Sequence, residues 1–310
     1  MKEIMPSFMK EKIKHFIILV TAKLWLAVFS NKKDLLLICS WGIGDTLFIR
    51  FFVEQLFQEK KKQISILCRS HTAMLFKDAE CVSKVIADNR MAKWMGYYCR
   101  HTKNTYNDRY IYCHFSDISD AFGERHSSIV EDYYKDILRL SGKPNIAYPC
   151  FNSPDAEEII RTKCIDKNSV ILCPGALSGT GIPEGFWQRL ADQLINNHFT
   201  VFTNVGMEKE KVLPGTKTLC ETLEATAAIS EKCAAMICAR SGICDLLACT
   251  DCRLFVLNNL NVTTHRHWGS AWDVNHFSRN PVITVNYEQD CEAKLIAEII
   301  EYACKGRNEL

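Results

Sequence analysis

Residues 34–55 have the sequence DLLLICSWGIGDTLFIRFFVEQ, and this stretch decides the fold of the chain. It begins with a continuous apolar run at 35–39, which is typical of a parallel strand covered on both faces. Gly42 and Gly44 follow, and they permit a sharp turn and a close approach of a ligand to the backbone. The next residues predict a helix with Asp45 in its first turn. The acid therefore lies at the carboxyl end of a strand, where open α/β sheets bind their ligands.

Trp41 is the unusual residue of this turn, because a small residue would serve the turn equally well. A large aromatic side chain between two turn elements is either a lid or a platform on which a ligand stacks. We interpret it as a residue that contacts a bound ligand.

The composition is that of an ordinary globular protein. The chain has 310 residues, 47% hydrophobic and 24% charged, which is enough for about two domains. A net charge of +2 gives no sign of a nucleic-acid-binding protein, which normally has a strongly basic face. The sixteen cysteines are scattered and often lie in apolar runs, so we interpret them as free thiols in the cytoplasm.

Two of these cysteines have the spacing of a zinc-binding pair. Cys249 and Cys252 form a C-x-x-C motif in the cysteine-rich segment 233–252. Cys249 lies in a predicted apolar helix, however, and no second tight pair follows. We therefore expect no metal at this position.

Residues 1–33 form a basic and apolar segment of their own. The part at 13–29, IKHFIILVTAKLWLAVF, is interrupted by Lys14 and Lys23, so it fits neither a signal peptide nor a membrane-spanning helix. With Trp25 and the flanking lysines it fits a helix that lies in a membrane interface. A helix that packs on the protein's own core, or in an oligomer contact, fits equally well.

From residue 34 onwards, predicted strands and helices alternate. The expected strands lie at 35–39, 64–68, 82–87, 109–115, 169–173, 199–204, 217–220, 235–239, 253–257 and 282–285. A helix is expected at 127–140, and the proline-containing segment 142–154 is the predicted linker. The pattern predicts an α/β protein of two Rossmann-like, doubly wound domains at 34–150 and 151–285, facing a central cleft, with a closing helix within 286–310.

Several nucleotide-binding classes do not fit. The glycines at 42–44 lack the third glycine of the dinucleotide-binding fingerprint, and no acid ends a second strand to hold a ribose. The chain contains no Walker loop.

Four motifs resemble, in order and spacing, the heptosyltransferases of glycosyltransferase family 9, which have the GT-B fold. They are GDTL at 44–47, HSSIVEDYYKDILRLSG at 126–142, VILCPGALSGTGIPEGFWQRLADQL at 170–194 and ICARSGICDLLA at 237–248. The resemblance implies transfer of a sugar, with inversion, from a nucleotide sugar to a hydroxyl of a cell-surface glycan of lipopolysaccharide or capsule type. It also implies that Asp45 acts as the base.

The third and fourth motifs depart from the family's pattern. The family has a lysine before its W-P that is thought to hold the donor phosphates, and residues 180–183, TGIP, supply no cation. The family's acid before S-G is replaced by Arg240, and its later histidine by Asp245. A guanidinium suits phosphate oxygens, so Arg240 can supply the missing charge. Arginine followed by a small hydroxyl residue is also similar to fucosyltransferase donor sites, so the base and sugar of the donor stay open.

The donor phosphates are expected at two loops. Helix N-termini bind phosphate without a metal, and both loops precede predicted helices. The predicted donor-binding residues are Gly175, Ala176, Ser178, Thr180, Arg240, Ser241, Gly242 and Asp245. The chain has no D-x-D motif, so we expect transfer without a metal or other cofactor.

The acceptor is expected on the side of the first domain. Asp45 is placed to take the proton of the acceptor hydroxyl, or else it is an ordinary helix N-terminal acid worth about 0.3–1 kcal/mol. The predicted acceptor-side residues are Trp41, Gly42, Gly44, His71 and His126. The segment 263–272, TTHRHWGSAW, predicts either a nucleotide or sugar loop with His265, His267 and Trp268, or an ordinary surface loop.

Two other functions stay open at this point. The missing lysine and histidine also fit a catalytically degenerate GT-B protein that binds a nucleotide or glycan, and paired Rossmann-like domains fit another nucleotide-sugar enzyme such as an epimerase. The expected partners are a nucleotide sugar and a glycan or glycolipid acceptor, without nucleic acid. We expect a cytoplasmic protein, with residues 13–29 as the candidate peripheral contact with the inner membrane, and leave the oligomeric state open.

Overall fold

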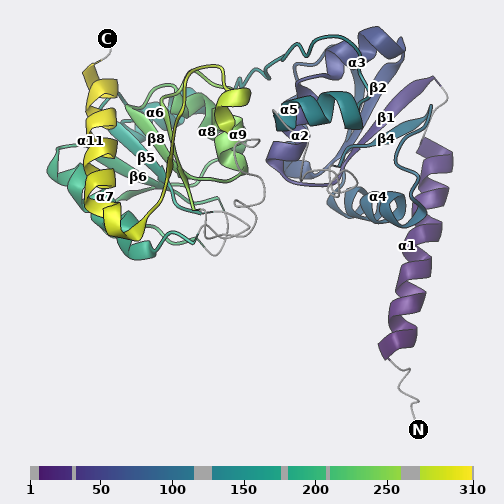
Figure 1. Cartoon of the computed structure of the whole chain (residues 1–310), viewed down its shortest axis with the longest axis horizontal. Helices are drawn as coiled ribbons and strands as arrows, with labels where there is room; N and C mark the ends of the chain where they lie inside the picture. Colours follow the sequence, from purple (N-terminus) through teal and green to yellow (C-terminus); the bar gives the residue numbers. More distant parts are fainter. Residues whose placement is uncertain are drawn as a thin grey trace. The chain divides into compact units, whose positions relative to one another are not determined.

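The computed structural model describes residues 7–29, 33–114, 128–175, 181–206, 210–259 and 273–308. The chain divides into two compact units, the first formed by Met1–His126 and Val130–Pro149 and the second by Ser127–Ile129 and Cys150–Leu310. Each unit contains one sheet of parallel strands with helices packed on it (Figure 1). The predicted α/β class with two Rossmann-like units is therefore confirmed.

The first sheet has four parallel strands in the order β3-β2-β1-β4. Their bounds are Asp34–Cys39 for β1, Gln63–Cys68 for β2, Val82–Ala87 for β3 and Tyr110–Tyr112 for β4. Residues 35–39 of β1 are all buried, so both faces of this inner strand are covered, as its unbroken apolar run predicts.

The helices of the first unit are α1 (Ser7–Phe29), α2 (Ile43–Arg50), α3 (Val53–Lys60), α4 (Asn89–Thr102) and α5 (Ile129–Asp132), with a 3-10 segment η1 (Ser70–Phe76). α4 begins after Asp88, whose carboxylate accepts hydrogen bonds from the N–H groups of Arg90 and Met91, both at 2.9 Å. α4 packs on β1 and β2, and α1 packs on α4 (Figure 1).

The helix predicted at 127–140 has a different form in the structure. α5 is followed by a π-helical turn, Tyr133–Ile137, in which the N–H of Leu138 donates to the Tyr133 carbonyl at 3.0 Å. The sequential residues Tyr133 and Tyr134 are both fully buried, the first against Phe48 and the second against Phe52. A π turn is a local departure from the α-helical spacing, and the packing of two adjacent tyrosines explains it here.

The second sheet has six parallel strands in the order β10-β9-β8-β5-β6-β7. Their bounds are Ser169–Cys173 for β5, Thr200–Asn204 for β6, Lys217–Leu219 for β7, Ala235–Ala239 for β8, Leu254–Asn258 for β9 and Ile283–Asn286 for β10. The helices of the unit are α6 (Ala156–Lys163), α7 (Glu184–Asn196), α8 (Leu223–Ser230), α9 (Gly242–Leu247) and α11 (Glu292–Asn308), with short 3-10 turns at Val274–His276 and Gln289–Cys291.

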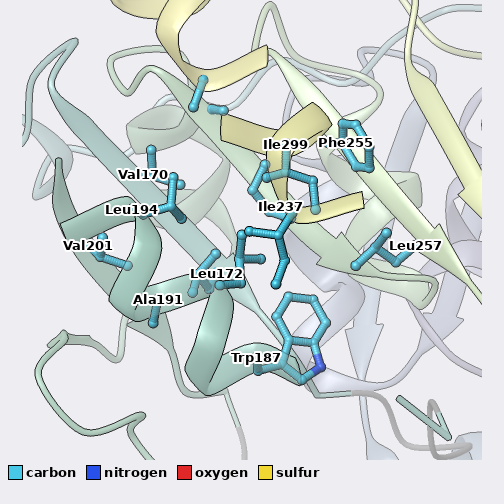
Figure 2. Close-up of a cluster of buried hydrophobic side chains, with 14 of the residues drawn as sticks. Val170, Leu172, Trp187, Ala191, Leu194, Val201, Ile237, Phe255, Leu257 and Ile299 are labelled. Carbon is cyan, nitrogen blue, oxygen red and sulfur yellow. The ribbon is translucent and has the colours of Figure 1, made fainter. Parts of the chain in front are cut away.

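The core of the second unit lies between the sheet and the helices α7 and α11. Figure 2 shows Trp187 and Leu194 of α7 and Ile299 of α11 around Leu172 and Ile237 of the central strands β5 and β8. All five side chains are buried, so this core fixes the strands whose carboxyl ends precede the predicted donor loops.

Within the described part of the chain, no helix combines the length and the apolar character needed to cross a membrane.

Candidate active site

The candidate base lies in the first turn of α2. Asp45 is half-buried, and its Oδ1 accepts a hydrogen bond from the Tyr133 hydroxyl at 2.7 Å. Tyr133 is fully buried, and burial together with the charge of Asp45 raises its pKa well above the usual range, so the phenol stays protonated and donates. A carboxylate that is oriented by a fixed donor and remains partly open has the geometry that a general base needs.

The glycine turn before Asp45 forms as predicted. Gly42 caps α2 in an extended conformation, and its carbonyl accepts hydrogen bonds from the Thr46 N–H at 3.3 Å and the Thr46 hydroxyl at 2.9 Å. Gly44 is buried inside the first turn. The turn therefore holds Asp45 directly after the end of β1.

Trp41 is held by contacts within the first unit. Its ring stacks on His114 with 4.1 Å between the ring centroids, and its indole N–H donates to the Tyr112 hydroxyl at 3.2 Å. The Arg100 guanidinium lies 5.6 Å from the centroid of the indole ring. With 36% of its surface exposed, Trp41 keeps a free portion for a ligand, but His114 covers one face of the ring.

His114 is neutral in this arrangement. It is 6% exposed, and burial, aided by the charge of Arg100, lowers its pKa to about 3. A neutral imidazole stacks on the indole without bringing a second positive charge beside Arg100.

Of the other two predicted acceptor-side residues, the structure describes His71, on a segment that contacts α2. His71 is in η1 and is exposed; partial burial of its ring and the charge of Arg69 lower its pKa. The Arg69 side chain donates from Nε to the Ser40 carbonyl at 2.8 Å, which joins the end of β2 to the end of β1. His126 lies outside the described residues.

On the second unit, Arg240 and Asp245 form a buried ion pair. Arg240 follows β8 and is 8% exposed, while Asp245 on α9 is 2% exposed. Arg240 Nη2 lies 2.8 Å from Asp245 Oδ1, and Nη1 donates to the Ser241 carbonyl at 3.0 Å. Burial raises the pKa of Asp245 and the charge of Arg240 opposes that shift. Because the two charges balance each other, the pair attracts a diphosphate less strongly than an unpaired arginine would.

Ser241 lies between Arg240 and α9 and has a buried hydroxyl. Its Oγ is buried and has no hydrogen-bond partner among the described residues. Ser241 is also the N-cap of α9, but its side chain does not cap the helix. A ligand oxygen at this point would satisfy the hydroxyl.

The loop after β5 is described only in part. Gly175 lies beside the Glu210 side chain, and a Cβ at Gly175 would come within 1.7 Å of Glu210 Oε1. A carboxylate at this point does not favour a phosphate. Ala176, Ser178 and Thr180 lie outside the described residues, as do His265, His267 and Trp268 of the predicted nucleotide or sugar loop.

The cysteines form no disulfide bonds among the described residues. All sixteen are free, and the thiols of Cys249 and Cys252 both donate to backbone carbonyls, those of Asp245 and Leu247, at 3.4 Å. No group of three or more His, Cys, Asp or Glu side chains among the described residues could hold a metal ion.

Three residues near the candidate base and Trp41 were not predicted from the sequence: Tyr133, His114 and Tyr112. Tyr133 is 88 positions from Asp45, and its place on the apolar face of the predicted helix indicates only burial. Tyr112 and His114 carry a usable signal, because residues two apart in a strand share a face. The motif RYIYCHF at 109–115 places both on one side of a predicted strand.

Comparisons with known proteins address the fold. No protein-family model matches the chain, and no curated protein matches its sequence. Solved structures do match. The ADP-heptose lps heptosyltransferase II of E. coli gives a TM-score of 0.60 at 13% sequence identity, covering 88% of this chain and 99% of that one. A glycosyl transferase family 9 protein from Veillonella parvula gives 0.55 at 10% identity, covering 90% and 98%.

The E. coli heptosyltransferase WaaC, solved with ADP, gives a TM-score of 0.52 at 11% identity, covering 89% of this chain and 100% of that one. At these identities the likeness concerns the fold alone, and it extends over nearly the full length of each match. The chain thus has the GT-B type of fold found in family 9 glycosyltransferases and heptosyltransferases, as the four sequence motifs predict.

Proposed function

We propose that this protein is a glycosyltransferase that moves a sugar from a nucleotide-sugar donor to a hydroxyl of a cell-surface glycan of lipopolysaccharide or capsule type. The observation that carries the proposal is Asp45, a partly open carboxylate oriented by the buried Tyr133 hydroxyl at the end of the inner strand β1. The fold shared with heptosyltransferases supports the same conclusion.

In the proposed reaction Asp45 accepts the proton of the acceptor hydroxyl. The acceptor oxygen attacks the anomeric carbon of the donor while the bond to the diphosphate breaks, and the departing diphosphate takes the electron pair. Attack from the face opposite the leaving group inverts the anomeric centre. The hydrogen bond from Tyr133 stabilises the ionised carboxylate and fixes its direction, so that it meets the hydroxyl in the reactive geometry.

The donor diphosphate is proposed to bind at the turn between β8 and α9. Asp245 orients Arg240, while the Ser241 hydroxyl and the backbone of Gly242 offer donors to phosphate oxygens. Gly175, Ala176, Ser178 and Thr180 are the proposed second part of the donor site, although the Glu210 carboxylate beside Gly175 opposes a phosphate at that end. WaaC has been solved with ADP, so an adenosine diphosphate sugar is the first donor to test. We propose that no metal takes part, and full activity in the presence of a chelator is the expected result.

The acceptor is proposed to approach the first unit. Trp41, Gly42, Gly44, His71 and His126 are its proposed contacts, and His265, His267 and Trp268 are proposed for the nucleotide or sugar. We propose that the acceptor is lipid-linked and that the reaction takes place at the cytoplasmic face of the inner membrane.

The decisive experiment is a transfer assay with a lipid-linked acceptor and ADP-, GDP-, UDP- and dTDP-sugars. With the accepted donor, Asp45→Asn is expected to lower kcat at least about 100-fold, the usual contribution of a general base. The matched control is Glu157→Gln, since Glu157 is an exposed acid in the first turn of α6. An Asp45→Asn protein with the control's activity would refute the assignment of the base.

A second function is favoured by the ion pair of Arg240 with Asp245. A cation that is already neutralised within the protein suits a GT-B protein that binds a nucleotide or glycan without turning it over. Specific binding of a nucleotide sugar, without transfer and without hydrolysis of the donor, would support this alternative. Interconversion of the free sugar nucleotide would instead indicate an epimerase.

A further inference from the structure

The helix α1 has apolar side chains on two opposite faces. On one face Ile18, Ala22 and Leu26 are buried, the latter two in a core cluster with Leu36 and Ile38 of β1. The opposite face has no such cover. Its apolar side chains are all exposed, and we call them the outer stripe: Ile13, Phe16, Ile17, Val20, Leu24 and Val28.

The outer stripe follows the helical repeat. Successive members are one, three or four positions apart, so at about 100° per residue they share one side of the helix. Phe16, Leu24 and Val28 have 67%, 63% and 76% of their surface exposed. A contiguous apolar surface of this kind marks an interaction site on a soluble unit.

Lysines border the outer stripe on both sides. By the helical repeat, Lys12 and Lys23 fall along one edge and Lys14 along the other, and all three are exposed. Glu11 is the acidic residue of the segment 11–29, and the same repeat places it on the side of the helix that packs on the first unit. The exposed surface of α1 is thus apolar in the middle and positively charged at its edges.

We propose that the outer stripe of α1 binds an anionic lipid bilayer, with the helix lying in the interface and its other face still packed on α4. An interfacial helix buries its apolar face at the boundary of headgroups and acyl chains, while lysines at its edges reach anionic headgroups. Each such lysine adds to the attraction of a negatively charged leaflet.

Charge favours the bilayer over a second copy of the chain. If two outer stripes packed on each other, the lysine borders of the two copies would meet, and like charges repel. A membrane with anionic lipids supplies negative charge along both edges of the stripe. In Figure 1 the N-terminal part of α1 extends beyond α4, and the side chains of the outer stripe are exposed.

The docking uses no residue of the candidate active site, so it can be tested independently of the transfer reaction. One part of the proposal rests on the proposed function: a protein docked on the bilayer would meet an acceptor glycan that is attached to a lipid carrier.

The test is sedimentation of the full chain with vesicles of phosphatidylethanolamine and phosphatidylglycerol, without donor or acceptor. The triple variant Phe16→Ser, Leu24→Ser, Val28→Ser is expected to bind at least about tenfold more weakly, because burial of these side chains drives binding. The matched control is Ile195→Ser, Ile283→Ser, Val212→Ser, three exposed apolar residues of the second unit, which is expected to bind like the wild type.

The lysines are tested in the same assay. Lys12→Gln, Lys14→Gln, Lys23→Gln is expected to weaken binding to these vesicles, and added salt is expected to act in the same direction. The control triple, Lys232→Gln, Lys294→Gln, Lys305→Gln, removes three exposed lysines of the second unit and is expected to have little effect.

Equal sedimentation of the wild type and the stripe variant would overturn the proposal. The proposal would also be overturned if the wild type did not bind vesicles but formed a dimer, and the stripe variant did not form this dimer. The outer stripe would then be a contact between copies of the chain. Circular dichroism of each variant checks that the fold is retained. A protein that binds vesicles but transfers no sugar would contradict the proposed function and leave the docking proposal intact.

Discussion

At the scale of single residues, the hydrogen bond from Tyr133 to Asp45 is the contact that links the two separate sequence motifs of the first unit. The Tyr133 phenol is fully buried and reaches the half-buried carboxylate at 2.7 Å. Tyr134, the next residue, is also fully buried, but its hydroxyl donates to the Ser141 carbonyl and accepts from the Gln55 side chain at 2.6 Å. The chain therefore supplies its own control for the loss of a buried phenol.

The first prediction compares these two tyrosines. Tyr133→Phe removes a donor that stabilises the ionised form of Asp45, so the acid limb of the kcat/KM profile is expected to move to higher pH. Tyr134→Phe is expected to leave the profile in place, although each change costs roughly 1–2 kcal/mol of stability. The pH profiles of both variants decide the point. If both shift equally, Tyr133 has only a structural role.

The second prediction concerns His114, whose pKa is lowered from 6.5 to about 3. Between these values the unfolded chain takes up a proton that the folded chain does not, so the stabilisation is complete above about 6.5 and is lost as the pH falls towards 3. The slope is at most about 1.4 kcal/mol per pH unit. His114→Phe is expected to flatten the dependence of unfolding free energy on pH between 7 and 4.

Denaturant titrations at several pH values measure this slope. His276→Gln, a change at an exposed histidine of the second unit, is the control. A wild type and a His114→Phe variant with the same slope would show that His114 is charged in the folded protein.

At the scale of elements, the sequence predicted what depends on local pattern. In the stretch 34–55 the strand and the glycine turn formed as predicted, because the apolar run and the glycines are signals carried by neighbouring residues. The single helix predicted after the turn is divided into α2 and α3 at Phe51 and Phe52. The π turn at Tyr133–Ile137 was missed, since it results from the packing of two tyrosines against α2 and the residues that follow it. For the same reason the partner of Asp45 was not predictable from spacing.

The ion pair of Arg240 with Asp245 shows the same limit. Each residue was predicted at the donor site as a replacement in the family's pattern, but their contact was not predicted. Residues i and i+5 do not face each other on a regular helix, and here the first of the pair lies before the helix begins. Only the fold of the turn between β8 and α9 brings the charges together.

The third prediction tests the packing of α11 on the second sheet. Gly306 lies inside α11, where helix propensity alone predicts that Gly306→Ala gains up to about 1 kcal/mol. A Cβ at Gly306 would lie 2.1 Å from the Ala234 carbonyl oxygen, however, so packing predicts a loss of about 1–3 kcal/mol. The sign of the change in unfolding free energy distinguishes the two effects.

Gly185→Ala is the matched control for this change. Gly185 lies in α7, where a Cβ meets only the flexible end of Arg189 at 3.3 Å, so this variant is expected to be neutral or slightly stabilised. A stabilised Gly306→Ala protein would show that α11 lies further from β8 than the structure places it.

At the scale of the whole molecule, the division into two compact units allows ligand binding to each unit to be measured separately. Two units with their own cores are expected to give two calorimetric transitions. A ligand that binds only the folded form of one unit stabilises that unit by mass action, by about 2.7 kcal/mol at 100 times its Kd. The residues proposed for the donor diphosphate lie in the second unit, and Asp45 lies in the first.

The last prediction follows from this separation. ADP, GDP, UDP and dTDP are each tested alone. The nucleotide diphosphate of the accepted donor is expected to raise the transition temperature of the second unit and to leave that of the first unit unchanged. The Gly306→Ala variant assigns the two transitions to the two units. It is expected to lower only the transition temperature of the second unit, because its clash lies wholly within that unit. Ser241→Ala, which removes the buried hydroxyl without a partner among the described residues, is expected to reduce the shift. A nucleotide that raises the first transition instead would place the donor beside Asp45 and reverse the assignment of the two units.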